Sequence, residues 1–319
     1  MATSQRHATC ATCARTYPAY GGIIDFRVGG AAWIDIDDDR DLAVELLAEP
    51  DSTAERLAML VFSRRPEWSE ERALRQTRRV ISAADHLVHD VDGWLAPVFA
   101  GKGAVLDLGC GPGALVAAAC RRGHLVIGVD VSLAWLVVAR ALIAEHGGTP
   151  VLAAAFGEAL PIADDALTGT VSLDVIEHVS DRERYVGELV RVLAPDGCAA
   201  LSTPNRFSLA AEPHVGVWGV GWLPRQWQRS YAERRSGLHY GSTWLLGLGE
   251  LTRLLARTGR LQFHVEAPAV PLTTLARSTR RRAFLARLYN SCVPSPLFQQ
   301  VALWFGPFFH VIAYKRLSR

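Results

Sequence analysis

The chain has 319 residues, of which half are apolar and 21% are charged. This composition is typical of a globular protein with a buried core, and it excludes a disordered, collagen-like or coiled-coil chain. The N-terminal stretch MATSQRHATC lacks the apolar segment of a signal peptide, and no 18-residue stretch is both uncharged and continuously apolar. We therefore expect a cytoplasmic protein whose six cysteines are reduced thiols.

The net charge of +2 conceals an asymmetry between the two parts of the chain. Residues 1–205 carry 18 basic and 28 acidic side chains, whereas residues 206–319 carry 16 basic and 4 acidic side chains. Such a split predicts that the C-terminal part meets an anionic substrate, a nucleic acid or a lipid surface. The alternative is that the two parts simply attract each other.

Residues 1–27 contain Cys10 and Cys13 in C-x2-C spacing, followed by a turn-rich stretch. The segment resembles the second half of the zinc ribbon that precedes some methyltransferases, ribosomal-RNA guanine enzymes among them. A structural zinc site needs four ligands, and His7 is the only further candidate nearby. We therefore predict no metal, and a ribbon-like remnant that packs against a sheet.

Residues 28–100 are predicted to form a helical extension or cap. Ser52 and Glu55 have the spacing of a capping box before one apolar-periodic stretch. Residues 68–89 are predicted to form a longer helix. The candidates for its buried stripe are Leu74, Val80, Ile81, Leu87 and Val88.

Residues 101–319 are predicted to form an α/β domain with a doubly wound, mostly parallel sheet, because apolar runs alternate with helical periods. The predicted strands are 104–108, 125–129, 151–155, 170–173 and 198–201, followed by 261–265 and 308–314. The predicted helices are 114–122, 133–145, 183–193, 244–258 and 273–289.

The stretch VLDLGCGPG, residues 105–113, is a strand that enters a glycine-rich turn and a helix. Such a turn lets the backbone approach a ligand, and Asp130 after the second strand is placed to accept both ribose hydroxyls of a nucleoside. With Ala114 the loop also satisfies the dinucleotide pattern G-x-G-x-x-G/A. Asp107 would repel a pyrophosphate but suits the ammonium group of a methionine, which favours S-adenosyl-L-methionine over NAD.

Residues 103–205 resemble the class I S-adenosylmethionine-dependent methyltransferases. VLDLGCGPG matches their first motif and GVDVS their second, and the similarity continues through ALPIADDALTGTVSLDVIEHV and LVRVLAPDGCAALSTPN. The nearest types are the ubiquinone and menaquinone methyltransferases and related natural-product enzymes. The resemblance implies a seven-stranded, Rossmann-like sheet and S-adenosylmethionine as the cofactor.

The resemblance also implies the residues that hold this cofactor. The methionine end is expected to contact the glycine loop, through Asp107, Gly109, Gly111 and Gly113. The ribose is expected to bind Asp130 and the adenine to pack on Val131, while Asp174 after the fourth strand faces the cofactor. The family usually has an acidic residue after the third strand that contacts the adenine amine. This chain has Phe156 there, so we expect stacking and backbone contacts from Phe156 and Gly157 instead.

Three histidines are candidates for a general base, since histidine titrates near neutral pH. His178 follows the fourth strand, while His214 and His239 lie in an insertion at residues 206–243. In the ubiquinone family the residues matching Asp174, Glu177 and His178 can hold a divalent metal. We predict no metal here, with that trio as the alternative.

The insertion at 206–243 is predicted to cover the acceptor site. It interleaves Trp218, Trp222 and Trp227 with arginines, of which Arg225 and Arg229 are candidates to grip an anionic acceptor. Residues 293–314 are uncharged but are broken by prolines and glycine, so burial as a last helix and strand is expected, with peripheral membrane contact as the alternative.

The sequence therefore predicts an S-adenosylmethionine-dependent methyltransferase that methylates an oxygen of a small natural-product, sugar or lipid-like acceptor. One alternative is an RNA-modifying methyltransferase, although nucleic acid is not the expected partner. The other is a protein that binds S-adenosylmethionine without catalysing methyl transfer.

Overall fold

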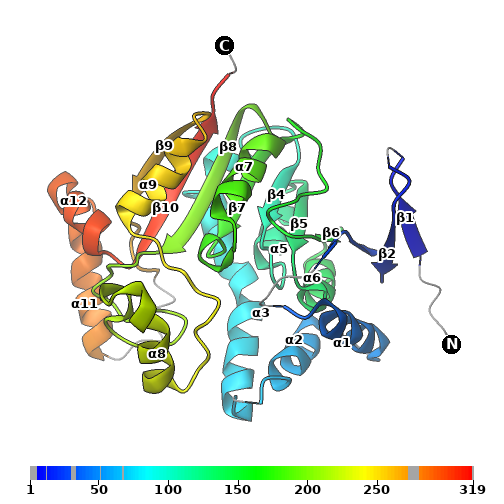
Figure 1. Cartoon of the computed structure of the whole chain (residues 1–319), viewed down its shortest axis with the longest axis horizontal. Helices are drawn as coiled ribbons and strands as arrows, with labels where there is room; N and C mark the ends of the chain where they lie inside the picture. Colours follow the sequence, from blue (N-terminus) through cyan, green and yellow to red (C-terminus); the bar gives the residue numbers. More distant parts are fainter. Residues whose placement is uncertain are drawn as a thin grey trace. The chain divides into compact units, whose positions relative to one another are not determined.

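A computed structural model describes residues 6–11, 13–29, 34–50, 52–66, 68–271 and 280–317 (Figure 1). The chain divides into two compact units. Unit 1 comprises residues 1–172 and 187–198, and unit 2 comprises residues 173–186 and 199–319. Each unit is described separately below.

The strands of unit 1 follow the order β1-β2-β3-β6-β5-β4-β7. They are β1 (Arg6–Thr9), β2 (Thr16–Tyr20), β3 (Ile23–Asp25), β4 (Val105–Leu108), β5 (Val126–Asp130), β6 (Val151–Ala154) and β7 (Leu167–Leu173), whose last residue belongs to unit 2. β3, β6, β5, β4 and β7 pair in parallel, whereas β1 and β2 form an antiparallel hairpin that continues into β3. The N-terminal segment thus joins the sheet as strands.

Helices α1, α2 and α3 come from the N-terminal extension, with α1 and α2 against α6 and α3 against α5 (Figure 1). The helices of this unit are α1 (Ile36–Ala48), α2 (Ala54–Ser63), α3 (Glu70–Asp92), α4 (Ala96–Phe99), α5 (Ala114–Cys120) and α6 (Leu133–Glu145). The capping box was misplaced by one residue, because Thr53 and not Ser52 accepts the bond that caps α2.

The predicted buried stripe of α3 is confirmed in part, since Val88 is buried and Val80, Ile81 and Leu87 are half-buried. The helix buries Ala73, Thr77, Ala84, Val88 and Val91, while Leu74 is 36% exposed. Its neighbour α5 has the sequence ALVAAAC and is almost wholly buried. Small side chains on both helices let the backbones approach closely, so alanine rather than leucine marks this interface.

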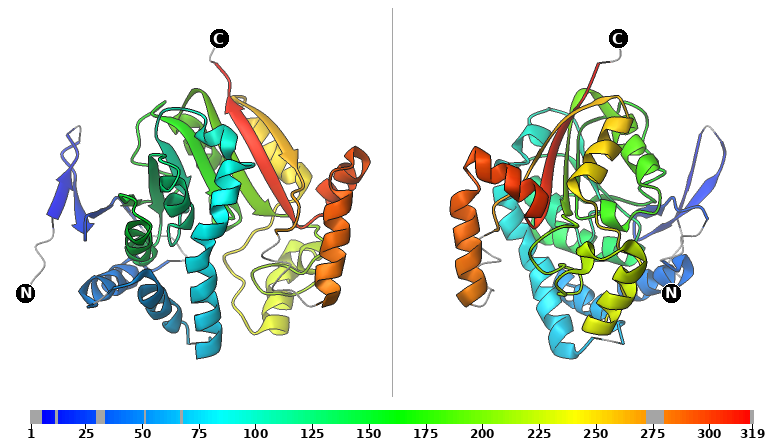
Figure 2. Two further views of the ribbon diagram at one scale, coloured as in Figure 1. Left: turned by 180° about the vertical axis from the view of Figure 1, so that it is seen from behind. Right: turned by 60° about the vertical axis from the view of Figure 1, so that its left-hand side comes forward.

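Unit 2 contains strands in the order β8-β10-β9, and β10 pairs with β9 antiparallel (Figure 2). α7 (Arg182–Val192) and β8 (Leu193–Pro204) contain residues of both units. The other elements are η1 (Ile176–His178), η2 (Val220–Trp222), α8 (Arg225–Ser236), α9 (Leu248–Arg257), β9 (Leu261–Glu266), α11 (Arg280–Cys292), α12 (Pro296–Phe305) and β10 (Phe308–Lys315).

The described residues form ten strands, not the predicted seven, because β1, β2 and β3 of the N-terminal segment extend the α/β sheet. Of the predicted helix at 273–289, residues 273–279 lie outside the described residues. The expected burial of 293–314 holds for β10, whose Phe309, Val311 and Ala313 are buried, but not for α12, where only Ala302 is buried. None of the described helices combines the length and apolarity needed to cross a membrane.

Candidate functional site

The glycine loop closes the end of β4 against the end of β5. The amides of Gly109 and Cys110 both donate to the carbonyl of Val129, at 2.7 and 3.1 Å. Gly113 has a φ of +77° and begins α5, and a Cβ added there would lie 2.7 Å from the Cβ of Ala139. At Gly111, with a φ of +49°, no described atom lies within 4 Å of that position, so this side of the loop is open to a ligand.

Asp130 is held in place at the end of β5 by the glycine loop and by its own turn. Its carboxylate accepts the amide hydrogens of Gly111 and Ser132, each at 2.8 Å. Its backbone carbonyl accepts a hydrogen bond from the amide of Ala155 at 3.0 Å. The next residue after Ala155 is Phe156, which is half-buried. The structure thus collects eight predicted cofactor residues at the carboxyl ends of β4, β5 and β6: Asp107, Gly109, Gly111, Gly113, Asp130, Val131, Phe156 and Gly157.

Asp107 lies in this group as a buried carboxyl, 3% exposed. Burial, together with the nearby charge of Asp130, raises the pKa of Asp107 to about 8. Burial also raises the pKa of Asp130, although the amide hydrogen bonds oppose this. A cation bound here would favour the ionised form of Asp107, so the pair fits a ligand with one positively charged end and a ribose.

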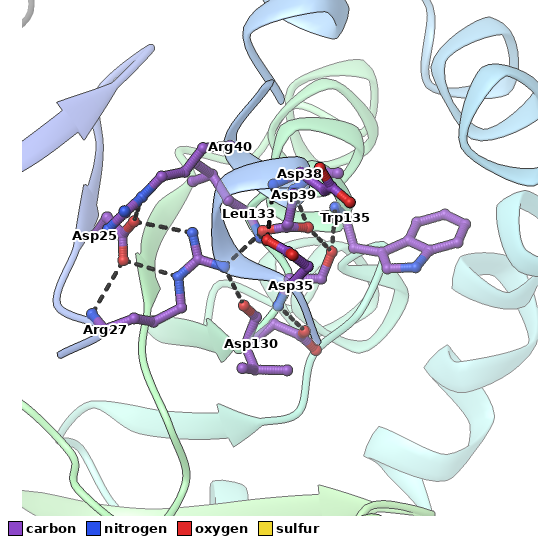
Figure 3. A network of polar contacts seen from close by, with 12 residues as sticks. Asp25, Arg27, Asp35, Asp38, Asp39, Arg40, Asp130, Leu133 and Trp135 are labelled. Carbon is purple, nitrogen blue, oxygen red and sulfur yellow. Dashed lines mark hydrogen bonds and ion pairs between the residues drawn. The ribbon is translucent and has the colours of Figure 1, made fainter. Parts of the chain in front are cut away.

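The turn after Asp130 is fixed by residues of the N-terminal extension (Figure 3). Asp39 of α1 accepts the amide of Leu133 at 2.7 Å and the hydroxyl of Ser132 at 2.7 Å, which caps α6. Arg27 donates to Asp39 at 2.6 Å and to the carbonyl of Val131 at 2.8 Å. Arg27 and Asp39, both from the N-terminal part of the chain, therefore hold the loop that carries Asp130 and Val131.

Arg27 itself is buried and is paired on its other edge with Asp25. Its Nε and Nη2 donate to the two carboxylate oxygens of Asp25 at 2.8 and 2.9 Å, and Arg40 donates to Asp25 as well (Figure 3). Burial alone would raise the pKa of Asp25, but the two guanidinium groups outweigh it and lower this pKa. Sequence reasoning missed this network, and the acidic run at residues 35–41 was its only signal.

Asp174, the remaining predicted cofactor residue, belongs to unit 2 and follows directly on β7. It is exposed, with a φ of +56°, and its carboxylate accepts the Ser202 hydroxyl at 2.8 Å. Within unit 1, Val171 of β7 pairs with Asp107 of β4.

Unit 2 brings together two of the three predicted histidines. The rings of His178 in η1 and His214 in the insertion lie 4.8 Å apart, edge to face. His214 Nδ1 lies 2.5 Å from Glu212 Oε1, and its Nε2 lies 3.9 Å from Glu177 Oε1. Glu177 is fully buried, and Thr203 donates to its other oxygen at 2.9 Å. Its Oε1 has no hydrogen-bond partner among the described residues.

The surroundings shift the pKa values of the two histidines in opposite directions. His178 Nδ1 lies 3.2 Å from the carbonyl of Ser242 and must donate to it. Burial and the nearby His214 lower the pKa of His178 to about 4. Burial would also lower the pKa of His214, but the hydrogen bond to Glu212 and nearby acidic charges raise it. Burial and the charge of Asp174 raise the pKa of Glu177 to about 7.

This arrangement suits proton transfer. Glu212 is 5% exposed and receives the Val215 amide on its second oxygen, so it is fixed in position. It orients His214 so that Nε2 faces the unpaired oxygen of Glu177. The directions of the two pKa shifts therefore favour His214 over His178 as the candidate base. The sequence analysis did not predict that Glu212 orients His214. The Glu-x-His spacing was the available signal for this pairing.

His239 is separate from this group. It is exposed, and its Nδ1 lies 3.1 Å from Glu233, to which Arg229 also donates. Arg225 pairs with Glu250 at 2.7 Å and lies over the ring of Trp244. Acidic side chains of the same unit thus pair with both arginines, and their role in gripping an anionic acceptor stays a prediction.

Three side chains could chelate a cation. The candidate ligand atoms of Glu177, His178 and His214 all lie within 4.8 Å of one another. This set differs from the alternative trio of the sequence analysis, since Asp174 is replaced by His214. Glu212 and Ser242 each engage one nitrogen of the two rings, which fits an acid–base group and also fits metal-ligating histidines. The absence of a metal stays a prediction.

Comparison with known proteins places the glycine loop in a recognised family. A family model described as a methyltransferase domain matches residues 106–201. The ubiquinone biosynthesis O-methyltransferase of Chelativorans sp. is 32% identical over 162 residues, which is 49% of this chain and 57% of that protein. The enzyme of the same name from Paracidovorax citrulli is 37% identical over 146 residues, and the alignment covers 42% of this chain and 57% of that enzyme.

An uncharacterized methyltransferase of Mycolicibacterium vanbaalenii is 41% identical over 98 residues, covering 31% of this chain and 38% of its own. A solved S-adenosylmethionine-dependent methyltransferase from Mesorhizobium loti is 19% identical with a TM-score of 0.49, and the alignment covers 73% of this chain and all of that one. The chain spans about half the length of the first curated relatives that it matches. Residues 106–201, which carry the glycine loop and Asp130, are a methyltransferase domain of the class I S-adenosylmethionine-dependent kind.

Proposed function

We propose that the chain binds S-adenosylmethionine in unit 1 and transfers its methyl group to an oxygen of a small natural-product, sugar or lipid-like acceptor. The observation that supports an oxygen acceptor most directly is the arrangement of half-buried His214 between buried Glu212 and Glu177, because a neutral hydroxyl must lose a proton when it is methylated. The curated relatives named as ubiquinone O-methyltransferases support the same class of reaction.

The residues of unit 1 fit the cofactor on chemical grounds. Asp107 offers a buried carboxyl to the ammonium group, Gly111 offers open backbone, and Asp130 retains acceptor capacity for ribose hydroxyls. Val131, Phe156 and Gly157 are proposed to contact the adenine. S-adenosylmethionine, when bound, supplies a methyl group on a positively charged sulfur, which keeps the electron pair of the broken C–S bond.

His214 is the proposed general base of unit 2. Its Nε2 takes the proton of the acceptor hydroxyl as that oxygen forms the new bond to carbon. Glu212 holds the ring in the tautomer with hydrogen on Nδ1 and stabilises the imidazolium that results. Glu177 faces the same nitrogen and accepts a hydrogen bond from it once His214 is charged.

The test is an assay of S-adenosylhomocysteine formation with the whole chain, S-adenosylmethionine and a panel of phenols, sugars and prenylated hydroxyl compounds. We expect release of S-adenosylhomocysteine with one class of hydroxyl acceptor and none with its O-methyl ether. Binding of S-adenosylmethionine without turnover on any acceptor of the panel would contradict the proposal. The outcome would then match a protein that only binds the cofactor.

A further inference from the structure

Exposed apolar side chains gather in one part of the chain. Of 19 large apolar residues that are exposed in the described structure, 14 lie within residues 209–317. Five of these are tryptophans: Trp218, Trp222, Trp227, Trp244 and Trp304. An isolated exposed apolar residue needs no explanation, but a concentration of large ones marks an interaction surface.

Helix α12 presents a continuous apolar stripe to solvent. Leu297, Val301 and Trp304 are spaced four and three residues apart, so they lie along one side of the helix. They are 84%, 52% and 53% exposed, whereas Ala302 on another side is buried. This arrangement inverts the pattern of an ordinary surface helix, whose apolar side faces the core.

The stripe continues into the insertion through direct contacts. Trp222 stacks on Phe305 with ring centroids 6.0 Å apart and planes 9° apart. The amide of Leu209 donates to the carbonyl of Phe305 at 3.0 Å, and the indole of Trp218 donates to the carbonyl of Leu209 at 3.1 Å. The indole of Trp222 likewise donates to the backbone. Because these N–H groups are satisfied internally, the exposed rings offer apolar surface.

The side chains of this surface, which we name the C-terminal apolar patch, come from the insertion and from α12. They are Leu209, Trp218, Trp222, Leu297, Val301, Trp304 and Phe305.

Positive charge accompanies the patch. Helix α11, shown with α12 in Figure 2, exposes Phe284, Leu285 and Leu288 together with the basic residues Arg280, Arg281 and Arg287. Residues 267–319 of the sequence contain eight lysines and arginines and no aspartate or glutamate. An apolar face rich in tryptophan beside arginines is the combination that binds the interface of an anionic bilayer.

We propose that the C-terminal apolar patch and α11 bind the surface of a bilayer that contains anionic lipids. The tryptophan and leucine side chains enter the boundary between headgroups and acyl chains, and the arginines of α11 contact lipid phosphates. A second copy of this chain fits less well, because a symmetric contact would bring two strongly basic helices together. If the proposed function also holds, an apolar acceptor dissolved in the bilayer reaches an enzyme already bound to its surface.

The test is flotation of the full chain with vesicles, without cofactor or acceptor. One set of vesicles is pure phosphatidylcholine and the other contains about one third phosphatidylglycerol. We expect the chain to float with the anionic vesicles and to be released by about 0.5 M salt. The double variant Arg281→Gln/Arg287→Gln should bind the anionic vesicles about 25-fold more weakly, at about fivefold for each charge.

The apolar contribution is tested with Leu297→Ser/Trp304→Ser, which should lower binding at least tenfold. Leu125→Ser and Arg75→Gln are matched controls, since both residues are exposed in unit 1, and they should bind as the parent does. Circular dichroism and thermal unfolding of every variant separate lost binding from lost folding.

Three outcomes would overturn the proposal. The first is a parent chain that does not float with anionic vesicles, and the second is patch variants that float as well as the controls. The third is a dimer that the Leu297→Ser/Trp304→Ser variant converts to a monomer, without vesicle binding, which would make a second copy the partner. Because no methyl transfer is measured, none of these outcomes bears on the proposed reaction.

Discussion

One buried group of carboxylates in unit 1 is paired with arginine, whereas the buried group in unit 2 faces a histidine. In unit 1, Asp25 and Asp39 meet the guanidinium of Arg27, and the pKa of Asp25 is lowered. In unit 2, Glu177 makes no ion pair with a described lysine or arginine, its Oε1 lacks a hydrogen bond among the described residues, and its pKa is raised to about 7. The paired carboxylates hold a loop in position, whereas the carboxylates that face His214 are proposed to take part in proton transfer.

The largest effect expected from breaking this comparison is on His214. His214→Ala should lower turnover about 10²–10⁴-fold, because the proposed base is lost, and should leave S-adenosylmethionine affinity nearly unchanged. Turnover comes from S-adenosylhomocysteine release and affinity from calorimetry. His264→Ala, an exposed histidine on β9, is the control. Equal turnover in both variants would show that positioning alone drives the reaction.

Asp107 is expected to show the next largest effect, on cofactor binding. Since its pKa is about 8, Asp107 is mostly protonated at pH 7 and must lose its proton to pair with the ammonium group. Binding of S-adenosylmethionine should therefore release close to one proton, measured by calorimetry in buffers of different ionisation enthalpy. Asp107→Asn should release none and bind about 1.5–3 kcal/mol more weakly. Proton release that persists in this variant would contradict the assignment.

A change at Arg27 tests whether the paired carboxylates of unit 1 hold the cofactor loop in position. Arg27→Met removes the bonds to Asp39 and Val131, so the Kd for S-adenosylmethionine should rise about tenfold with a smaller change in kcat. Asp39→Asn, which keeps the side-chain shape, should raise the Kd in the same direction. Arg40→Met is the matched control, because Arg40 contacts Asp25 and Asp37 but not the loop. A lower Tm in all three variants with no change in Kd would mean that the network only stabilises the fold.

The smallest effect expected is that of metal removal. Glu177, His178 and His214 are proposed to act as an acid–base group, so a chelator should leave the rate unchanged. A rate that falls on chelation and returns with added Mg²⁺ would instead assign the cluster to a divalent cation.

The parts predicted from the sequence are those set by local pattern. The strands before Gly109 and Asp130 are short buried apolar runs, and helix 133–145 was predicted at its observed bounds. The Arg27–Asp39 bond, the Arg225–Glu250 pair and the Glu177–His214 approach join residues 12, 25 and 37 positions apart. The hydrophobic periodicity of helices and strands describes neighbours within one element, so it does not predict pairs this far apart in the sequence. The buried alanines of α3 were not predicted for another reason, because close helix packing selects small residues rather than the most apolar ones.

The pH dependence of turnover tests the proposed roles of Glu212 and His214 most directly. His214 must be unprotonated to act as a base, so turnover should rise with pH through its raised pKa and then level off. Glu212→Gln removes the carboxylate that raises this pKa, so the rising limb should move to lower pH while the plateau falls. A rising limb at the same pH in the parent and in Glu212→Gln would contradict the role of Glu212 and His214.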